Sequence, residues 1–589
     1  MAEKKGTLSI NSDNIFPIIK KWLYSDHDIF FRELISNGCD AITKLKKLDM
    51  MGEYNFPEGH KNKVDVILDP EKKTLKFIDT GLGMTADEVE KYITQIAFSG
   101  ATQFLEQYKD KTEGDQIIGH FGLGFYSAFM VADEVHIDTL SWQKDAKPVH
   151  WECDGGTEYD MQDGTRTEVG TCITLFLNED CLQFCNEYKA TEVIKKYCSF
   201  MPVEIYVSRA NTPETQTILA SEKLDSDHVI EEVKKEKEED PDKLKITKRP
   251  ELINDTHPLW TKNPSECTKE EYIDFYRKVF MDYKEPLFWI HLNMDYPFNL
   301  KGILYFPKIN MEYESIEGVI KLYNNQVFIA DNIKEVIPEF LLLLKGVIDC
   351  PDLPLNVSRS ALQNDGFVKK ISDYITKKVA DKLSGMCKTQ KEEYEKYWDD
   401  IAPFIKFGCL KDEKFCEKMT DYILFKNLDG KYMTLPECLE VNKTDPDETQ
   451  EGAVDENGEK VEAEVVEDKN EDSAEEEKKD KTIYYVTDEK QQSQYINMFK
   501  AAKMDAVMLT DRIDQPFISQ LEAKNEGIHF ARIDADLTDA FKAKTSKKTQ
   551  EELNAQAEKV EKLVQKALKN DKIKVKIEKL KNKKVSSVL

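Results

Sequence analysis

The chain has 589 residues, too many for one compact core, so we expect roughly three or four domains. Apolar residues make up 40% of the chain and charged residues 33%, with a formal net charge of −28 at pH 7. Such an acidic composition is typical of a protein with a well-solvated surface and argues against nucleic-acid binding as its main task.

Neither a membrane segment nor a secretory signal is predicted. The longest apolar run, 340–348, contains a lysine and is far shorter than the roughly 20 residues that a bilayer span requires. Residues 1–14 lack the apolar stretch and cleavage site of a signal peptide. The twelve cysteines are scattered and form no C-x-x-C pair. We therefore expect a cytoplasmic protein whose cysteines are mostly buried small hydrophobes.

Two breaks in composition divide the chain. Mixed charges replace the apolar periodicity at 231–245, within a predicted charged linker or solvated helix at 222–253. The stretch 443–481 is acidic and poor in apolar residues, which predicts a disordered insertion. A linker is the simple interpretation of that stretch, and a tail that binds basic partners is the alternative.

Three folded blocks remain, at 1–221, 254–442 and 482–589. The first two mix helical periodicity with strand-like runs, and the third alternates strands and helices in the rhythm of β-α-β units. An alternating segment at 573–580 predicts a last strand. The fold class is therefore α+β, in several domains.

A helix is predicted from about Phe31, and it carries polar residues at i, i+4, i+7 and i+11. These residues are Glu33, Asn37, Asp40 and Lys44. Their spacing places them on one stripe, which is either the solvated side of a surface helix or the wall of a ligand site. The apolar side, predicted to pack on a sheet, contains Ile29, Phe30, Leu34, Ile35 and Ile42.

Three glycine-containing stretches follow this helix in the first block. Asp79 ends an apolar strand just before Gly81 and Gly83; Gly119, Gly122 and Gly124 precede a helical pattern; and Gly170 and Thr171 open another strand. Each stretch alone is more often a tight turn or a structural loop. Backbone amides before a helix also form anion sites, for which phosphate is the usual ligand.

Taken together, these stretches resemble the ATP-binding motifs of one superfamily. "ELISNGCDA", "DTGLGM", "IGHFGLGF" and "GT" before a strand resemble the GHKL motifs shared by gyrase B subunits, MutL proteins, histidine kinases and heat-shock protein 90 chaperones. "FFRELISNGCDA", "IGHFGLGFYSAFMVADEV" and "LPLNVSRSALQ" are most similar to the heat-shock protein 90 family, and the resemblance covers nearly the entire chain. The bacterial type is indicated, because the chain has no C-terminal M-E-E-V-D tail.

The resemblance implies a Bergerat-type ATP-binding α/β sandwich, followed by α/β middle and C-terminal domains. Glu33 matches the catalytic carboxylate that orients water, Asn37 the magnesium ligand, and Asp79 the acceptor of the adenine amino group, with Thr171 nearby through water. The predicted ATP-binding set is Asn37, Asp40, Lys44, Asp79, Gly81, Gly83, Met84, Gly119, His120, Phe121, Gly122, Leu123, Gly124, Phe125, Thr171 and Arg359.

Arg359 and Gln363 belong to the stretch that resembles the family's middle-domain catalytic loop, with Asn356 as a supporting polar group. An arginine delivered to the γ-phosphate by another domain makes hydrolysis conditional on closure. The simpler interpretation of Arg359 is a surface arginine that caps a helix.

The function implied is an ATP-dependent chaperone clamp that binds and remodels non-native client proteins, with ATP and Mg²⁺ as cofactors and no nucleic-acid or membrane partner. A DNA-transaction or signalling ATPase of the same superfamily is the alternative. The resemblance implies a homodimer in the full-length form and partner chaperones. The family's dimer helices do not follow 573–580, because either the chain is shortened, which we favour, or it lacks them by nature. A shortened chain is expected to dimerise weakly or not at all. Trp289 is a candidate client contact or a core residue.

Several positions depart from the family pattern. His120 stands where glutamine is frequent, which predicts a pH-dependent turnover near neutrality. Phe98 replaces a frequent lysine and removes an expected cationic contact to phosphate. Gly38 and Cys39 replace other small residues, and Gly38 is expected to loosen the helix slightly.

Overall fold

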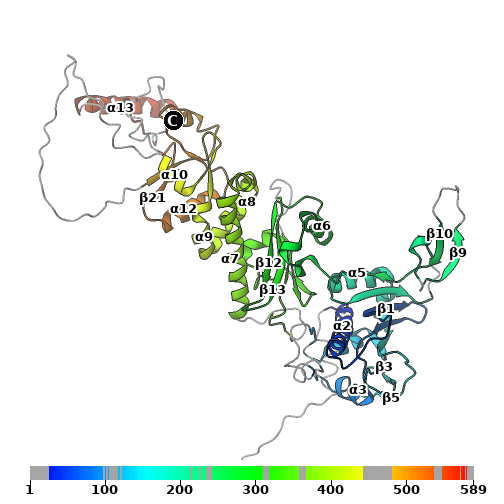
Figure 1. Ribbon diagram of the computed structural model, residues 1–589. Helices are drawn as coiled ribbons and strands as arrows, with labels where there is room; N and C mark the ends of the chain where they lie inside the picture. The colour runs from blue at the N-terminus through cyan, green and yellow to red at the C-terminus, as the bar shows by residue number, and fades with distance from the viewer. Residues whose placement is uncertain are drawn as a thin grey trace, which may run out of the picture. The chain divides into compact units, whose positions relative to one another are not determined.

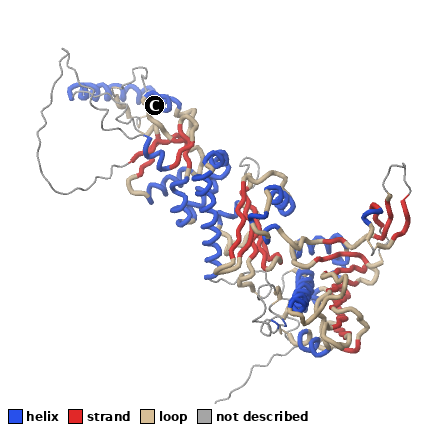
Figure 2. The backbone as a smooth tube through the Cα atoms, in the orientation of Figure 1, coloured by secondary structure: helices blue, strands red, loops and turns tan. Residues whose placement is uncertain are grey.

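The computed structural model describes residues 26–96, 98, 100, 104, 117–119, 122–211, 215–224, 227–233, 242–308, 318–356, 366–441, 481–535, 547–570, 572, 574–577 and 579. The chain divides into two compact units. Unit one comprises Met1–Pro338 and Leu342–Asp373, and unit two comprises Glu339–Leu341 and Tyr374–Leu589. Both units combine sheets and helices (Figures 1 and 2), which confirms the expected mixed α and β class.

The first sheet of unit one has eight strands in the order β11-β7-β1-β2-β6-β3-β4-β5. β1 pairs in parallel with β7, and the other pairs are antiparallel. Alternate side chains of each central strand face the core, as the period of two requires. The strands are β1 (Lys63–Asp69), β2 (Thr74–Asp79), β3 (Ala132–Leu140), β4 (Val149–Cys153), β5 (Asp160–Asp163), β6 (Gly170–Leu177), β7 (Glu204–Arg209) and β11 (Glu251–Leu252).

Helix α2 (Ile29–Met50) packs on this sheet and is buried on nearly every side. Phe30 and Phe31 meet Phe77 of β2 at ring-centroid distances of 6.1 and 5.6 Å. The polar stripe is also covered, since Glu33 is only 5% exposed. The solvated-surface interpretation of this stripe is therefore wrong. The accompanying helices are α3 (Ala86–Tyr92), α5 (Glu187–Cys198) and the 3-10 helices η2 (Gly124–Met130) and η3 (Glu179–Cys185).

The described part of the charged segment 222–253 contains strands. β9 (Val229–Val233) and β10 (Lys243–Thr247) form a three-stranded antiparallel sheet with β8 (Thr215–Leu219). Lys245 lies opposite Glu231, and their side chains form an ion pair of 3.0 Å. Opposite charges on facing strands stabilise such a pair. Mixed charge therefore accompanies cross-strand pairing here, where we expected a linker or a helix.

The second sheet of unit one has the order β12-β13-β16-β14-β15. Helix α6 (Lys269–Phe280) packs beside it and begins with a capping box between Thr268 and Glu271. Trp289 of β12 is half-buried and stacks on Tyr272 of α6 with ring centroids 4.8 Å apart, which favours the core interpretation of that tryptophan. The strands are β12 (Phe288–Met294), β13 (Leu300–Phe306), β14 (Ile320–Asn324), β15 (Val327–Asp331) and β16 (Lys345–Asp349).

Unit two contains a five-stranded sheet of order β18-β17-β20-β19-β21. β19 pairs in parallel with β20 and with β21, and helices α11 and α12 lie between these strands in sequence, so the predicted β-α-β rhythm is confirmed. The strands are β17 (Leu424–Asn427), β18 (Tyr432–Thr434), β19 (Lys481–Val486), β20 (Val507–Met508) and β21 (Ile528–Arg532). The helices are α7 (Gly366–Thr389), whose first residues belong to unit one, α8 (Lys391–Lys411), α9 (Glu413–Met419), α10 (Leu435–Val441), α11 (Ser493–Ala501), α12 (Asp514–Lys524) and α13 (Lys547–Leu568).

The strand predicted at 573–580 is wrong for the described residues 574–577, which form no ladder. The backbone N–H of Val575 donates instead to Glu561 of α13, over 2.8 Å. An alternating pattern makes a strand only where a neighbouring strand accepts its hydrogen bonds. Residues 443–480 of the acidic stretch lie outside the described residues, and its last residue, Lys481, begins β19.

Two further sequence predictions concern cysteines and membrane segments. Eleven of the twelve cysteines are buried, Cys267 is half-buried, and all are free thiols, which confirms the expected core role. Within the described ranges, none of the helices is long and apolar enough to cross a bilayer.

Candidate functional site

Glu33 lies on the first turns of α2, in a buried ion pair with its neighbour. Arg32 donates from Nε and Nη2 to Glu33 Oε1, at 2.9 and 2.7 Å, and the side chains are 2% and 6% exposed. The glycine loop is the segment 119–124, which contains Gly119, Gly122 and Gly124. Oε2 of Glu33 faces this loop, because a Cβ atom added at Gly124 would lie 2.6 Å from it. The predicted catalytic carboxylate is thus oriented by an arginine and directed at the loop.

Asp40 holds the beginning of the glycine loop. Its Oδ1 accepts the backbone N–H of Ile118 and its Oδ2 accepts that of Gly119, both at 2.7 Å. Hydrogen bonds to a buried carboxylate are stronger than those between neutral groups. We expected Asp40 to line a pocket wall and the Gly119 amide to hold phosphate. Here the two groups bind each other, so Asp40 holds the beginning of the loop, and its contact with a ligand stays a prediction.

Glycine is needed at Gly122 for backbone reasons. Its φ is +64°, and an added Cβ would lie 2.4 Å from the carbonyl oxygen of Phe98. A side chain in this left-handed region is strained even without a neighbour. The ring of Phe98 stacks on Tyr92 at 5.9 Å, and the ammonium of Lys91 lies 5.3 Å from the Phe98 ring centroid.

Asp79 ends β2 at the bottom of the site, 8% exposed. Its Oδ1 accepts the N–H of Gly81 at 2.8 Å. Burial raises the pKa of Asp79 to about 7, although the Gly81 hydrogen bond and the charge of Arg166 act in the opposite direction. A carboxyl that changes charge near neutrality is a strong candidate for a functional group.

Thr171 lies directly opposite Asp79, in the antiparallel pairing of β2 with β6. Its hydroxyl is 3.0 Å from that of Thr139 on β3, and the Thr139 hydroxyl accepts the N–H of Met84 at 2.9 Å. Side chains that face each other across two strands share one face of the sheet. The predicted pair of Asp79 and Thr171 is therefore brought together.

Gly81 and Gly83 serve the protein backbone. A Cβ at Gly81 would lie 2.4 Å from Ala41 Cβ, and one at Gly83, whose φ is +62°, would lie 1.9 Å from the carbonyl oxygen of Leu140. Their predicted place in the ATP-binding set stays a prediction. The described contacts show that they let the turn after β2 approach α2 and the end of β3.

The other predicted residues lie around the same helix and loop. Asn37 Oδ1 would be 3.8 Å from a Cβ at Gly119. Lys44 is half-buried, and burial lowers the pKa of its ammonium, against the opposing charge of Asp40. Leu123 packs against the core, and the buried Phe125 ring lies 6.0 Å from both Phe129 and Trp151.

These residues fit a magnesium ion with a nucleotide. An amide oxygen such as that of Asn37 is a hard ligand of the kind that Mg²⁺ accepts, with phosphate oxygens and water supplying the rest of its shell. Asn37 lies beside the beginning of the glycine loop, and glycine-rich loops of this kind hold phosphates in other proteins.

Four predicted residues lie outside the described residues: His120, Phe121, Arg359 and Gln363. The supporting residue Asn356 is described and is half-buried.

Sequence reasoning missed three contributors. Arg32 binds Glu33, Thr139 joins Thr171 to Met84, and Gly38 lets α2 approach the strand, since an added Cβ would lie 3.1 Å from Asp79 Cβ. The only sequence signal for the role of Arg32 was its positive charge directly before Glu33. Gly38 was expected to loosen the helix, and its contact with Asp79 gives it a packing role instead.

Replacing Asp40 with alanine is expected to release the loop. Loss of two charge-assisted hydrogen bonds should lower the free energy of unfolding by about 2–4 kcal/mol and weaken nucleotide binding. Hydrogen exchange of the Ile118 and Gly119 amides should accelerate. Replacement of the exposed Asp87 with asparagine is the control. Unchanged exchange in the Asp40 variant would contradict the anchoring role.

Comparisons with known proteins show which family this chain resembles. The profile of the family described as "Hsp90 protein" matches residues 183–451. The chain is 41% identical over 551 residues to "Chaperone protein HtpG" of Bacteroides thetaiotaomicron, covering 93% of this chain and 72% of the relative. For the protein of the same name in Porphyromonas gingivalis, the identity is 41%, covering 90% and 70% of the two chains. For that of Borrelia garinii subsp. bavariensis it is 29%, covering 95% and 82%.

Proposed function

Because the chain belongs to the heat-shock protein 90 family, as a molecular chaperone of the HtpG type, we propose that ATP binding and hydrolysis drive its action on non-native client proteins. ATP binding closes a clamp, and hydrolysis resets it. The clamp consists of a Bergerat-type ATP domain at 1–221, a middle domain at 254–442 and a C-terminal domain at 482–589. It acts in the cytoplasm, and the full-length form is a homodimer.

One observation carries this proposal. Glu33 and Asn37, one helical turn apart on α2, both face the glycine loop, at Gly124 and Gly119 respectively. A carboxylate, a hard oxygen ligand and backbone amides are the groups that phosphoryl transfer to water requires. A DNA-transaction or signalling ATPase is not favoured, because the matched relatives are named as chaperones.

Each residue of the site has a separate task. Glu33, held by Arg32, orients and activates the attacking water, and the amide oxygen of Asn37 would coordinate magnesium. Asp79 accepts a hydrogen bond from the amino group of adenine, with Thr171 beside it. Asp40 keeps the loop in place. Magnesium, when bound, would neutralise part of the phosphate charge.

Replacing Arg359 with alanine is expected to leave nucleotide affinity nearly intact and lower turnover about tenfold or more, because its charge acts on the transition state. Steady-state hydrolysis and equilibrium nucleotide binding measure the two effects. Equal turnover in the variant and the wild type would contradict this role.

The proposed function as a whole is tested by two measurements on one preparation. ATP hydrolysis is followed with and without a competitor for the nucleotide pocket, and suppression of aggregation of an unfolded protein is followed under the same conditions. We expect the competitor to abolish hydrolysis. Hydrolysis that resists the competitor would overturn the ATPase proposal.

A further inference from the structure

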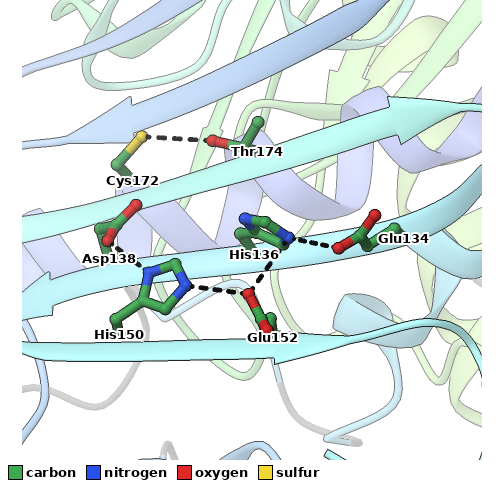
Figure 3. A network of polar contacts seen from close by, with 7 residues as sticks. All are labelled: Glu134, His136, Asp138, His150, Glu152, Cys172 and Thr174. Carbon is green, nitrogen blue, oxygen red and sulfur yellow. Dashed lines mark hydrogen bonds and ion pairs between the residues drawn. The ribbon is translucent and has the colours of Figure 1, made fainter. Parts of the chain in front are cut away.

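The outer face of the eight-stranded sheet carries two histidines among three carboxylates (Figure 3). On β3, Glu134, His136 and Asp138 alternate with the buried Val135 and Ile137. On β4, His150 and Glu152 alternate with buried residues in the same way, and they lie opposite Asp138 and His136 respectively. The pleat of two neighbouring strands thus gathers five polar side chains in one place.

This cluster is separate from the nucleotide site. Thr139, which follows Asp138 on β3, is fully buried. It points to the other face of the sheet, where its hydroxyl meets that of Thr171. Successive side chains of a strand point to opposite faces. The five residues of the cluster therefore lie on the face of the sheet opposite to Thr139 and Thr171.

The distances within the cluster fit a tetrahedral metal ion. Glu152 Oε2 is 3.2 Å from His150 Nε2 and 3.5 Å from His136 Nε2. The ligand atoms of these three residues all lie within 4.8 Å of one another. Zinc bound to nitrogen and oxygen at about 2.0–2.1 Å implies ligands about 3.4 Å apart. Two of the three separations already have this length.

Asp138 prepares His150 for such a role. His150 Nδ1 is 2.8 Å from Asp138 Oδ1. In the tautomer that donates this hydrogen, Nε2 presents its lone pair toward Glu152 and His136. A carboxylate behind a histidine is the usual second partner of a zinc ligand, because it fixes the tautomer and the ring orientation.

The cluster is open to solvent, and Glu134 is available as a fourth metal ligand. The side chains of His136 and His150 are 21% and 19% exposed, so an ion can reach them from solvent. Glu134 Oε1, 2.7 Å from His136 Nε2, is close enough to complete the shell after a small movement, and water can take the same position. Imidazole and carboxylate together favour zinc-class ions over magnesium or calcium, which prefer oxygen alone.

We propose that His136, His150 and Glu152 form a binding site for a zinc-class divalent transition-metal ion, which joins β3 to β4 on the outer face of the sheet. Its binding would stabilise the folded chain by mass action, since the unfolded chain does not hold the three ligands together.

Titration of the full chain, freed of metal and nucleotide, tests the site. The wild type is expected to bind one equivalent of Zn²⁺, and this equivalent is expected to be lost in the His136→Ala, His150→Ala double variant, which lacks two of the three ligands. His60→Ala is the matched control, because His60 bonds to Asn62 outside the cluster. Zn²⁺ should raise the midpoint of thermal unfolding in the wild type and the control but not in the double variant.

Cobalt distinguishes this site from the cysteines. Co²⁺ bound here should show ligand-field absorption without the thiolate charge-transfer band, and Asp138→Asn should weaken its binding about tenfold while the fold is retained. Failure of Zn²⁺ to bind, binding that survives in the double variant, or a thiolate band would each overturn the proposal. In those cases the cluster is only a network of histidine–carboxylate ion pairs.

Discussion

Replacing Glu33 with glutamine is expected to lower ATP turnover about a hundredfold or more, while ATP affinity changes little. A positioned general base contributes roughly this factor, and the amide cannot accept the proton of the attacking water. Glutamine has nearly the same size, so its oxygen can still accept the hydrogen bonds that Arg32 donates at 2.7 and 2.9 Å. Single-turnover hydrolysis and equilibrium binding separate the two effects.

The controls for this variant address the buried ion pair. Glutamine leaves the guanidinium of Arg32 without its counter-charge in a buried place, which lowers stability. Thermal unfolding must therefore be recorded, and turnover measured well below the transition. Replacement of the exposed Glu58 with glutamine should change neither quantity. If the Glu33 variant hydrolyses ATP at the normal rate while folded, another group activates the water.

The second large effect concerns Asp79 and pH. Burial raises the pKa of Asp79 to about 7, so the carboxyl is neutral below that pH and charged above it. A carboxylate accepts the adenine amino hydrogen bond more strongly than a neutral carboxyl. Affinity for adenosine, which has no phosphate to titrate in this range, is expected to rise as pH increases through about 7.

Asp79→Asn is the decisive variant for that prediction. It should remove the pH step and weaken ATP binding by roughly a hundredfold, the value of a lost charge-assisted hydrogen bond. Calorimetric titration of wild type and variant across the pH range measures both quantities. A pH step that persists in the variant would assign the titration to another group.

The same pKa also affects stability. The pKa of Asp79 in the folded protein is raised above its value of about 4 in the unfolded chain. At a pH between these two pKa values, the native protein therefore binds more protons than the unfolded chain. The contribution of Asp79 to stability is complete below about pH 4 and is lost as pH rises through about 7. A bound adenine offsets this loss, because it favours the charged form.

The sequence predicted which residues of the candidate site lie together better than it predicted the contacts that support them. Helical spacing placed Glu33 and Asn37 on one stripe, and both face the loop. Strand order placed Asp79 opposite Thr171. These relations depend on the period of a helix and on motif resemblance, both of which are local in sequence.

Supporting contacts depend on long-range packing, which no local pattern encodes. Thr139 is distant from both Met84 and Thr171 in sequence, yet it joins them. Asp40 appeared to be a wall residue, because nothing in its neighbourhood indicated that Ile118 would need an acceptor. Likewise, the charges of 222–253 gave no sign that Lys245 and Glu231 would face each other across two strands.

The glycine loop is fixed at two points: Asp40 binds the amides of Ile118 and Gly119, and the backbone of Gly122 lies against the carbonyl of Phe98. Two residues separate Gly119 from Gly122 in the sequence. The two contacts thus hold the chain on both sides of these residues, one from the side chain of Asp40 and the other from the backbone of Phe98.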